Sequence, residues 1–453
     1  MIEIPNLPTW ADVLLVLLGV AAARAALITA RTPQGAAAWV VFLLAFPLLA
    51  LPAFALFGGV SRINQKPDDR HGPADAPDDA NARLGVLRAI TRMPLRAGND
   101  VRLLIDGRET FDAIFEAIDA AETEVLVQYY IIRDDESGRA LRDRLVAASR
   151  RGVRVRVLCD LIGSLTLGWR YSRVLRRAGA EIRGIPGPRR SIGRIGINFR
   201  NHRKTVVVDG RIGFTGGINI GNEYVDGADE FEQWRDTHIR VQGPMTGQLR
   251  ELFAADWFAV TGKGLPDMPP PRPSGERFGL VTGFGPTDPM ERGSLLLCGL
   301  VGLAQKRLWI TSPYLVPHTD LLTAIQLTHM RGVEVRILIP HPADKWLAWY
   351  ASRGFARELI RTGIEIREYL PGFMHQKVML IDDDIVSVGT VNLDIRSSLL
   401  NFEQTALIED RGFASEVEEM LIGDFARSAP LPDPPPRHIR FLAPIARLFG
   451  PLL

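Results

Sequence analysis

One polar pattern occurs twice in this 453-residue chain, and it limits the possible folds more than any other feature. The pattern is H-x-K-x4-D-x6-G-x-x-N, and the second copy lies 173 residues after the first. Random placement gives two matches to its H-x-K-x4-D part in about one of 50,000 sequences of this composition. The two copies comprise His202, Lys204, Asp209 and Asn219, and His375, Lys377, Asp382 and Asn392. The repeat predicts a fold built from two similar halves.

The elements around each copy also repeat in order. Strand, helix, strand and strand patterns occur in the first half at 124–131, 140–152, 153–160 and 180–185. The same order occurs in the second half at 307–316, 320–332, 333–340 and 364–369. Alternation of strands and helices predicts an α/β fold with partly parallel strands, present as two halves packed with pseudo-two-fold symmetry. Two unrelated α/β domains are the alternative.

Two apolar stretches precede the repeat. Residues 36–60 are 25 residues without a charge, which is long enough as a helix to cross a hydrocarbon core of about 30 Å. Residues 10–28 are almost as apolar. We therefore expect 1–60 to form a membrane hairpin of two transmembrane segments, with Pro47 and Pro52 able to kink or break the second. A buried helix pair or a cleaved signal peptide is the alternative.

Basic residues next to the hairpin bear on its orientation. Arg62, Lys66 and Arg70 follow it and favour a cytoplasmic body, because short cytoplasmic segments are enriched in Lys and Arg. Arg24 and Arg31, in or beside the short connection, argue for the opposite orientation. We expect a multi-pass membrane protein with a cytoplasmic body.

Composition shifts divide the rest of the chain. Residues 61–98 are polar and rich in Pro, Asp and Arg, which predicts a linker that leads to a surface helix. Residues 263–276 contain five prolines and predict a second linker, which separates the halves at 99–262 and 277–436. The segment 437–453 has no acid and is predicted to be basic and amphipathic, either lying on a membrane surface or packing on the protein.

Overall charge and cysteine content exclude several classes of protein. The chain has 54 Lys and Arg against 52 Asp and Glu, so no global field attracts nucleic acid. Its two cysteines, Cys159 and Cys298, supply neither a disulfide framework nor a Cys-based zinc site. We therefore expect no nucleic-acid partner, no metal and no cofactor.

The repeated residue types suit phosphoryl transfer. We place 205–209 and 378–382 in strands and expect the His and Lys before each range to lie on the same strand. A His and a Lys two residues apart on a strand share one face. Lys supplies positive charge for a phosphoryl oxygen, and Asn219 and Asn392 supply neutral amide donors. If the halves meet at their motifs, one of His202 and His375 attacks phosphorus while the other protonates the leaving oxygen. A solvated strand edge is the alternative for either motif alone.

Charged residues near the first motif form a second candidate site. The stretch 184–208 contains six basic residues and no acid, interleaved with Ile and Phe. This composition predicts a patch that binds lipid headgroups or the membrane interface. The residues proposed for it are Arg189, Arg190, Arg194 and Arg200, and a solvated loop is the alternative.

The chain resembles the phospholipase D superfamily, whose two HKD motifs match the two copies described above. It is similar over essentially its whole length to bacterial cardiolipin synthases. This similarity rests on the hairpin and on five short stretches: LFG at 56–58, QWxD at 233–236, GTVNLDxRS at 389–397, LNFE at 400–403 and PLL at 451–453.

The resemblance implies a metal-free phosphatidyl transfer in the bacterial inner membrane through a phosphohistidine. Phosphatidylglycerol is then both donor and acceptor, glycerol is released, and anionic membrane lipids are the partners. It assigns His202 as nucleophile and His375 as general acid. His375 has no Arg nearby in the sequence, so we expect it to be protonated more easily than His202. Phospholipase D or phosphatidylserine synthase activity, with water or serine as acceptor, is the alternative. One departure is Gly217, where the family usually has Ser.

Four carboxylates are candidates at this site. Asp209 and Asp382 each lie where a strand runs into turn chemistry, so a structural role competes with a catalytic one. Asp236 and Glu403 follow their histidines by 34 and 28 residues, where similar enzymes place an acid against the imidazole. We prefer these two as orienting groups, because a His base needs a partner that fixes its tautomer and stabilises its cation. Surface salt bridges are the alternative.

Overall fold

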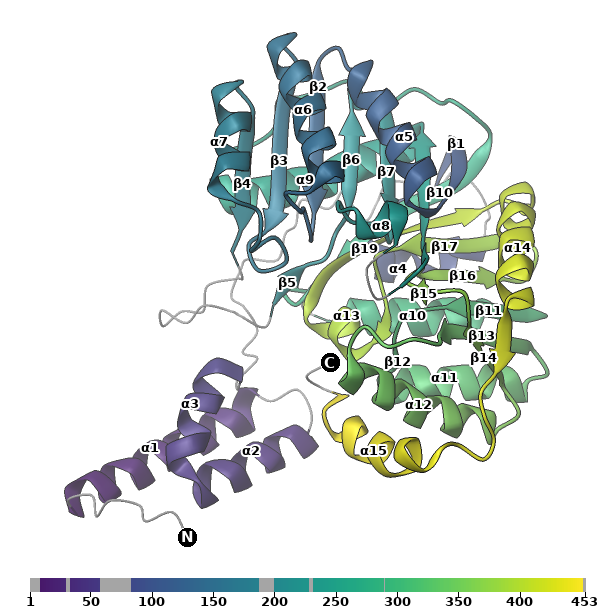
Figure 1. Cartoon of the computed structure of the whole chain (residues 1–453). Helices are drawn as coiled ribbons and strands as arrows, with labels where there is room; N and C mark the ends of the chain where they lie inside the picture. Colours follow the sequence, from purple (N-terminus) through teal and green to yellow (C-terminus); the bar gives the residue numbers. More distant parts are fainter. Residues whose placement is uncertain are drawn as a thin grey trace. The chain divides into compact units, whose positions relative to one another are not determined.

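Figure 1 shows the computed structural model of the chain, which describes residues 9–29, 33–57, 83–186, 199–227, 231–288 and 290–450. The described residues belong to two units. The first holds the N-terminal helices, and the second holds the two halves that carry the repeated motif.

The N-terminal unit contains α1 (Thr9–Thr29), α2 (Pro33–Ala45) and α3 (Pro47–Phe57), which pack through small and aromatic side chains. Among the described residues, α1 is the one helix long and apolar enough to cross a membrane. The second stretch, expected to span as one helix over 36–60, is broken at Phe46. Pro47 has no N–H to continue the helical hydrogen bonds, so α3 starts as a new helix there.

The first half of the second unit is a sheet of alternating strands and helices. Its strand order is β4-β3-β2-β6-β7-β9-β1. The strands are β1 (Arg96–Ile105), β2 (Glu124–Tyr129), β3 (Arg154–Asp160), β4 (Glu181–Ile185), β6 (Thr205–Val208), β7 (Ile212–Gly216) and β9 (Thr237–Gln242). The pairs β2·β3 and β3·β4 are parallel and the others are antiparallel, which gives the expected partly parallel sheet.

The second half repeats this order as β14-β13-β11-β16-β17-β19-β10. Its strands are β10 (Arg277–Phe284), β11 (Arg307–Thr311), β13 (Glu334–Pro340), β14 (Glu365–Tyr369), β16 (Val378–Ile381), β17 (Ile385–Gly389) and β19 (Asn401–Glu409), with β20 (Ser428–Pro430) beyond β14. The duplicated strand order confirms the prediction of two α/β halves.

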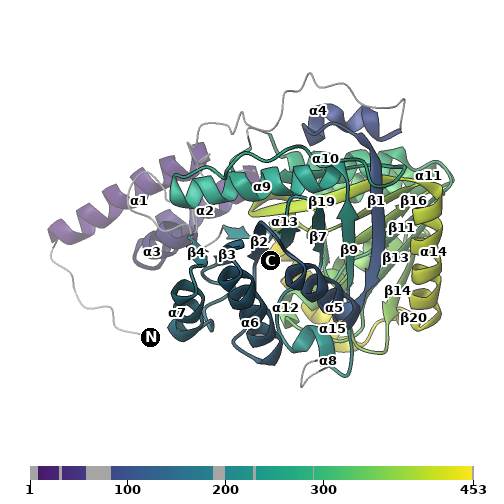
Figure 2. The ribbon, with the colours of Figure 1, turned by 90° about the horizontal axis from the view of Figure 1, so that it is seen from above.

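Helices cover both faces of each half. In the first half, α5 (Asp106–Asp119), α6 (Glu136–Arg150) and α7 (Trp169–Arg177) lie on one face and α9 (Pro244–Thr261) lies on the other (Figures 1 and 2). The second half has α10 (Arg292–Leu303), α11 (Thr319–Met330), α12 (Trp346–Ile360) and α14 (Arg411–Ala426). The helices expected at 140–152 and 320–332 are α6 and α11.

Strand β1 joins the halves. Arg96 and Asn99 pair with β10, whereas residues 100–105 pair with β9, so the strand passes from one half to the other. The change occurs at an irregularity in register, where Gly98 has φ +85° and lies against Pro273. A Cβ at Gly98 would lie 2.8 Å from the Pro273 Cβ, so both the backbone angle and the space require glycine.

One segment that was expected to be a linker is folded. Residues 83–98, expected to be part of a linker, belong to the folded body as a 3-10 helix (Arg83–Leu87), α4 (Arg88–Thr91) and the start of β1. Leu84 and Leu87 are buried in the main core, and their burial explains why this polar stretch is ordered. The chain between α9 and β10, at 263–276, has neither helix nor strand.

Candidate active site

Two very short parallel strand pairings between the halves position the histidines. β5 (Arg200–Asn201) pairs with the start of β19, and β8 (Trp234–Arg235) pairs with β15 (Phe373–Met374). The His202 backbone N–H donates to the Phe402 carbonyl at 2.9 Å, and that of His375 donates to the Arg235 carbonyl at 2.7 Å. Each histidine therefore follows a strand whose partner belongs to the other half.

These pairings place each histidine beside an acid. His202 Nδ1 lies 2.9 Å from Glu403 Oε2. His375 Nδ1 lies 2.7 Å from Asp236 Oδ2. The sequence spacing assigned each acid to the histidine that precedes it, and the structure corrects this: each acid contacts the histidine of the other half.

The surroundings of His202 indicate its tautomer. Its Nδ1 lies 2.9 Å from a Glu403 carboxylate oxygen and 3.1 Å from the Thr390 carbonyl oxygen, and both oxygens are acceptors. We therefore assign the proton of the neutral ring to Nδ1, which leaves the lone pair on Nε2. The contact with Asp236 gives the same assignment for His375.

Both imidazoles are buried and neutral at rest. Burial lowers the pKa of His202 to about 4, with Glu403 opposing the shift and Lys204 adding to it. Burial, followed by the charges of Lys377 and Lys204, lowers the pKa of His375 well below its ordinary value. The charges of Lys204 and Lys377 act on His202 as well, so the expectation that His375 is protonated more easily stays a prediction.

The lysines of the two motifs occupy equivalent positions. Lys204 Nζ donates to the His202 carbonyl at 2.9 Å, and Lys377 Nζ donates to the His375 carbonyl. Burial lowers the pKa of Lys204 to about 7 and that of Lys377 to about 8. The strands β6 and β16 begin one residue after these lysines. The His and Lys of each motif were expected on these strands, but they lie in the segments that precede them.

The motif asparagines contact groups of their own half. Asn219 Nδ2 donates to the Tyr224 hydroxyl at 2.9 Å. Asn392 Nδ2 donates to Asp394 at 3.0 Å, while its buried Oδ1 has no hydrogen-bond partner among the described residues. These amides hold loops next to the histidines.

Asp209 and Asp382 terminate strands through one arrangement. Both have positive φ, 53° and 52°. Asp209 accepts backbone N–H groups of residues 122–124, and Asp382 accepts those of residues 305–307. Burial raises the pKa of each carboxyl, but these donors outweigh it and lower both pKa values. Between a structural and a catalytic role for these two aspartates, the turn geometry supports the structural role.

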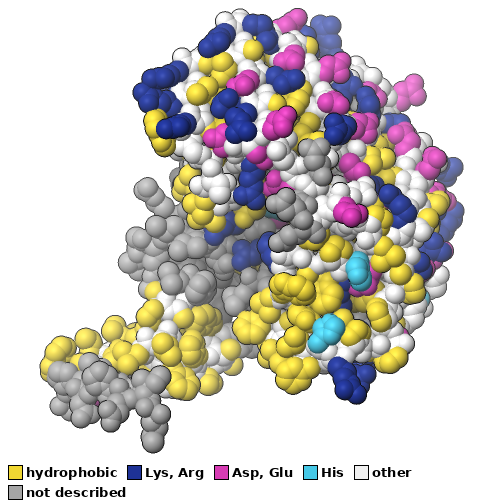
Figure 3. Space-filling view, in the orientation of Figure 1, with side chains coloured by type: hydrophobic (Ala, Val, Ile, Leu, Met, Phe, Trp, Pro, Cys, Tyr) yellow, Lys and Arg dark blue, Asp and Glu magenta, His cyan; other side chains and the backbone are white. Residues whose placement is uncertain are grey.

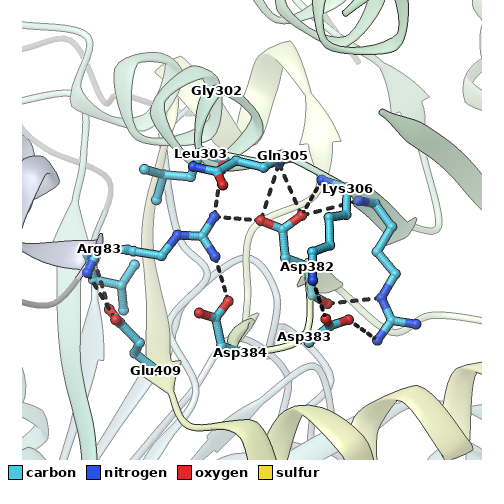
Figure 4. Close-up of polar contacts among 12 residues, drawn as sticks. Arg83, Gly302, Leu303, Gln305, Lys306, Asp382, Asp383, Asp384 and Glu409 are labelled. Carbon is cyan, nitrogen blue, oxygen red and sulfur yellow. Dashed lines mark hydrogen bonds and ion pairs between the residues drawn. The ribbon is translucent and has the colours of Figure 1, made fainter. Parts of the chain in front are cut away.

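The second of these turns has an additional cation (Figure 4). Arg83 reaches both Asp382 and Asp384 at 2.6 Å and the Leu303 carbonyl at 2.7 Å. The backbone N–H groups of Arg83 and Leu84 donate to the Glu409 carboxylate. Arg83 thus fastens the beginning of the folded body to the turn that follows the second motif.

Gly217 and Asp236 form a close pair in the first half. A Cβ at Gly217 would lie 2.0 Å from Asp236 Oδ1, so the carboxylate occupies the space that a side chain would need. In the second half Thr390 stands at this motif position, and its hydroxyl donates to Glu403. The departure at Gly217 thus accompanies an acid that approaches the backbone too closely for any side chain there.

The two acids also differ in their electrostatics. Burial raises the pKa of Asp236, and the charge of Lys377 and the Thr237 N–H only partly oppose it. Burial raises the pKa of Glu403 as well, but His202, Lys204 and the Thr390 hydroxyl outweigh it, so this pKa is lowered. The two halves therefore present unequal carboxylates to their histidines.

Aromatic rings next to the histidines were not singled out from the sequence. The Tyr130 ring lies edge-on to His202 at 5.2 Å between centroids. Trp234 and Phe373 lie 5.2 and 6.0 Å from His375. The available signal was position: Tyr130 directly follows β2, and Trp234 lies in the QWxD stretch.

The predicted basic patch is only partly described. Arg189, Arg190 and Arg194 lie outside the described residues. Arg200 lies on β5, two residues before His202, and its charge acts on Tyr130 and Asp160. Within the described ranges, no three His, Cys, Asp or Glu side chains are grouped to hold a metal ion.

Comparison with known proteins identifies the family. A family model described as "Cardiolipin synthase, PLD-like domain" matches residues 114–257 and 297–424. The chain belongs to this family. It is 41% identical to cardiolipin synthase A of Pseudomonas putida over an alignment of 463 positions, which covers 96% of both chains. It is 39% identical to cardiolipin synthase A of Pseudomonas aeruginosa LESB58, and that alignment covers 98% of this chain and 96% of the relative.

A solved structure shares the fold. Phosphatidylserine synthase of Haemophilus influenzae Rd KW20 superposes with a TM-score of 0.61 at 17% identity, covering 82% of this chain and all of the other. At this identity the likeness shows a shared fold alone.

The turn at Asp382 makes a prediction about stability. Asp382→Asn removes a charged acceptor from Arg83 and from backbone N–H groups, so we expect it to lower the thermal unfolding midpoint in detergent, by an amount equivalent to about 1–3 kcal/mol. The turnover of the folded fraction should stay near that of the unchanged protein. Asp383→Asn, at an exposed neighbour, is the control and should change the midpoint little. An unchanged midpoint with lost turnover would instead show a catalytic Asp382.

The close pair in the first half makes a second prediction. Gly217→Ser restores the residue that the family usually has, yet it should lower kcat by about 10- to 100-fold, because the new Cβ displaces the carboxylate that orients His375. Gly217→Ala should cost as much, since the conflict lies at Cβ. Thr390→Ser keeps the hydroxyl and serves as the control. Full activity of Gly217→Ser would contradict the proposed geometry.

Proposed function

We propose that this protein is a membrane phosphatidyltransferase that makes cardiolipin and glycerol from two molecules of phosphatidylglycerol. The observation that carries the proposal is the pair of crossed histidine–carboxylate contacts, each with a motif lysine beside it. With the Nδ1 proton held by an acid, each imidazole has its lone pair on Nε2, so one ring can attack phosphorus and the other can gain the proton that the leaving oxygen needs. The two lysines supply positive charge for the phosphodiester.

In the first step, His202 Nε2 attacks the phosphorus of one phosphatidylglycerol. A P–N bond forms, the P–O bond to the terminal glycerol breaks, and the departing alkoxide takes a proton from protonated His375. Binding of the anionic substrate brings negative charge to the histidines and favours the protonated ring that this step needs. Glycerol leaves and His375 is left neutral.

In the second step, a hydroxyl of the second phosphatidylglycerol attacks the same phosphorus. Neutral His375 takes the hydroxyl proton, a P–O bond forms and the P–N bond breaks. Cardiolipin is released, and His202 regains its neutral form while His375 is protonated for the next cycle. Water or serine in place of the second lipid would give phosphatidic acid or phosphatidylserine by the same steps.

The carboxylates and lysines support both steps. Glu403 holds the Nδ1 proton of His202 and stabilises the positive charge that this ring gains when Nε2 is bonded to phosphorus. Asp236 does the same for protonated His375. Lys204 and Lys377 bring positive charge to the phosphoryl oxygens, whose negative charge grows in each transition state.

We further propose that the N-terminal helices anchor the enzyme in the bacterial inner membrane. In this proposal α1 crosses once, the kinked α2–α3 segment crosses back, and the body is cytoplasmic. The basic residues that follow the hairpin support this orientation. Arg200 and the neighbouring arginines at 189, 190 and 194 would bind the headgroups of anionic lipids.

Purified protein in detergent with phosphatidylglycerol alone tests the reaction. Cardiolipin and free glycerol should form in equal amounts. His202→Ala and His375→Ala should each lower the rate by at least about 100-fold, because each step uses both rings. His318→Ala, at a histidine outside both motifs, is the control. Phosphatidic acid as the main product would indicate a phospholipase D, and a histidine variant with normal turnover would exclude the two-histidine mechanism.

The lysines predict a pH dependence. In the free enzyme the pKa values of Lys204 and Lys377 are about 7 and 8, so positive charge is lost as the pH rises through this range. We therefore expect kcat/KM to fall from pH 7 to 9, while kcat falls less because the bound phosphodiester keeps the lysines protonated. Initial rates across pH 6 to 9.5 test this. A constant kcat/KM would contradict the role assigned to the lysines.

A further inference from the structure

The last helix of the body, α15 (Arg437–Leu448), has one face fixed to the protein. Ile439, Ala443 and Ala446 are buried, and Ala446 belongs to a small core with α12. Arg447 lies 4.2 Å from the Phe355 ring and donates to Glu358 at 2.7 Å. The helix is therefore held in place by α12.

The opposite face of α15 is apolar and exposed. Phe441 is 71% exposed and Leu448 is 79% exposed, with Ile445 between them. Residues three and four apart lie one above the other on a helix, so these side chains form a continuous stripe. Figure 3 shows hydrophobic side chains gathered over α12 and α15. A helix that buries one apolar face and exposes a second has a face left for another partner.

The stripe continues onto the beginning of α12. Trp346 is 67% exposed, and its ring lies 6.3 Å from that of Tyr350, which in turn lies 6.1 Å from His438 on α15. Leu347 is also exposed. Tryptophan and tyrosine with one polar and one apolar end are the side chains enriched at the boundary between hydrocarbon and water.

The charges on α15 indicate which kind of partner this face binds. Its charged residues are Arg437, Arg440 and Arg447, and it has no Asp or Glu. A second copy docked on this face about a two-fold axis would bring like charges together. An anionic bilayer supplies the apolar layer for the stripe and negative headgroups for the arginines.

We propose that α15, together with Trp346 and Leu347 of α12, inserts into the interface of an anionic phospholipid bilayer. This inference deepens the proposed membrane function and rests on it. It gives the body its own attachment to the bilayer, separate from the N-terminal helices. The outer stripe enters the acyl-chain boundary while Arg437 and Arg440 remain at the level of the headgroups.

Depth-dependent quenching on the full-length chain tests the proposal. In a Cys159→Ala/Cys298→Ala background, Phe441→Cys is labelled with a fluorophore and the protein is reconstituted into phosphatidylcholine–phosphatidylglycerol vesicles with brominated acyl chains. The matched control is Ile422→Cys on α14, an exposed apolar position outside the stripe. We expect quenching at 441 to exceed that at 422 at least threefold. Equal quenching at the two positions would overturn the proposal.

A second measurement distinguishes bilayer binding by this surface from the reaction at the active site. Phe441→Gln/Leu448→Gln should lower cardiolipin formation severalfold in phosphatidylglycerol vesicles and leave it unchanged in detergent micelles, where no bilayer must be approached. An equal loss in both media would overturn the proposal. Because quenching does not depend on turnover, a protein that bound the bilayer at 441 but made no cardiolipin would refute the proposed reaction and support the surface.

Discussion

The site depends on two short parallel strand pairings that cross between the halves. β5 with β19 and β8 with β15 are only two residue pairs each, yet each one ends where a motif histidine begins. They deliver Glu403 to His202 and Asp236 to His375. Neither half contains a complete histidine–acid pair, so the duplicated fold produces a site only when the halves are joined.

This crossing concentrates charge in a buried space. Two lysines, two carboxylates and two histidines lie in the interior at the junction, and burial is the largest influence on the pKa of each. Burying unpaired charges is costly, and here each cation has carboxylates nearby that offset part of the cost. In the mechanism that we propose, these charges are already in place for the transition state of a phosphodiester and need no reorganisation.

The sequence was sufficient for the duplicated architecture, since long apolar strands and a strict motif repeat are local signals. It was insufficient for the crossing, because a strand pairing of two residues has no periodicity to detect. The spacing from His202 to Asp236 wrongly assigned the acid to its own half. Residues 83–98 are folded because Leu84 and Leu87 are buried in a core formed by residues far away in the sequence. The break at Phe46 depends on one proline. The contact of Gly217 with Asp236 is visible only in three dimensions.

A trapping experiment tests most directly whether the two halves form one active site in which His202 is the covalent nucleophile. The His375→Ala protein is given a short-chain phosphatidyl ester of p-nitrophenol, whose leaving group needs no acid, and the peptides are mapped by mass spectrometry. We predict a burst of one nitrophenol per enzyme and a stable phosphatidyl adduct on His202, because no base remains to activate the acceptor. An adduct on any other residue, or steady release of nitrophenol with no adduct, would contradict this prediction.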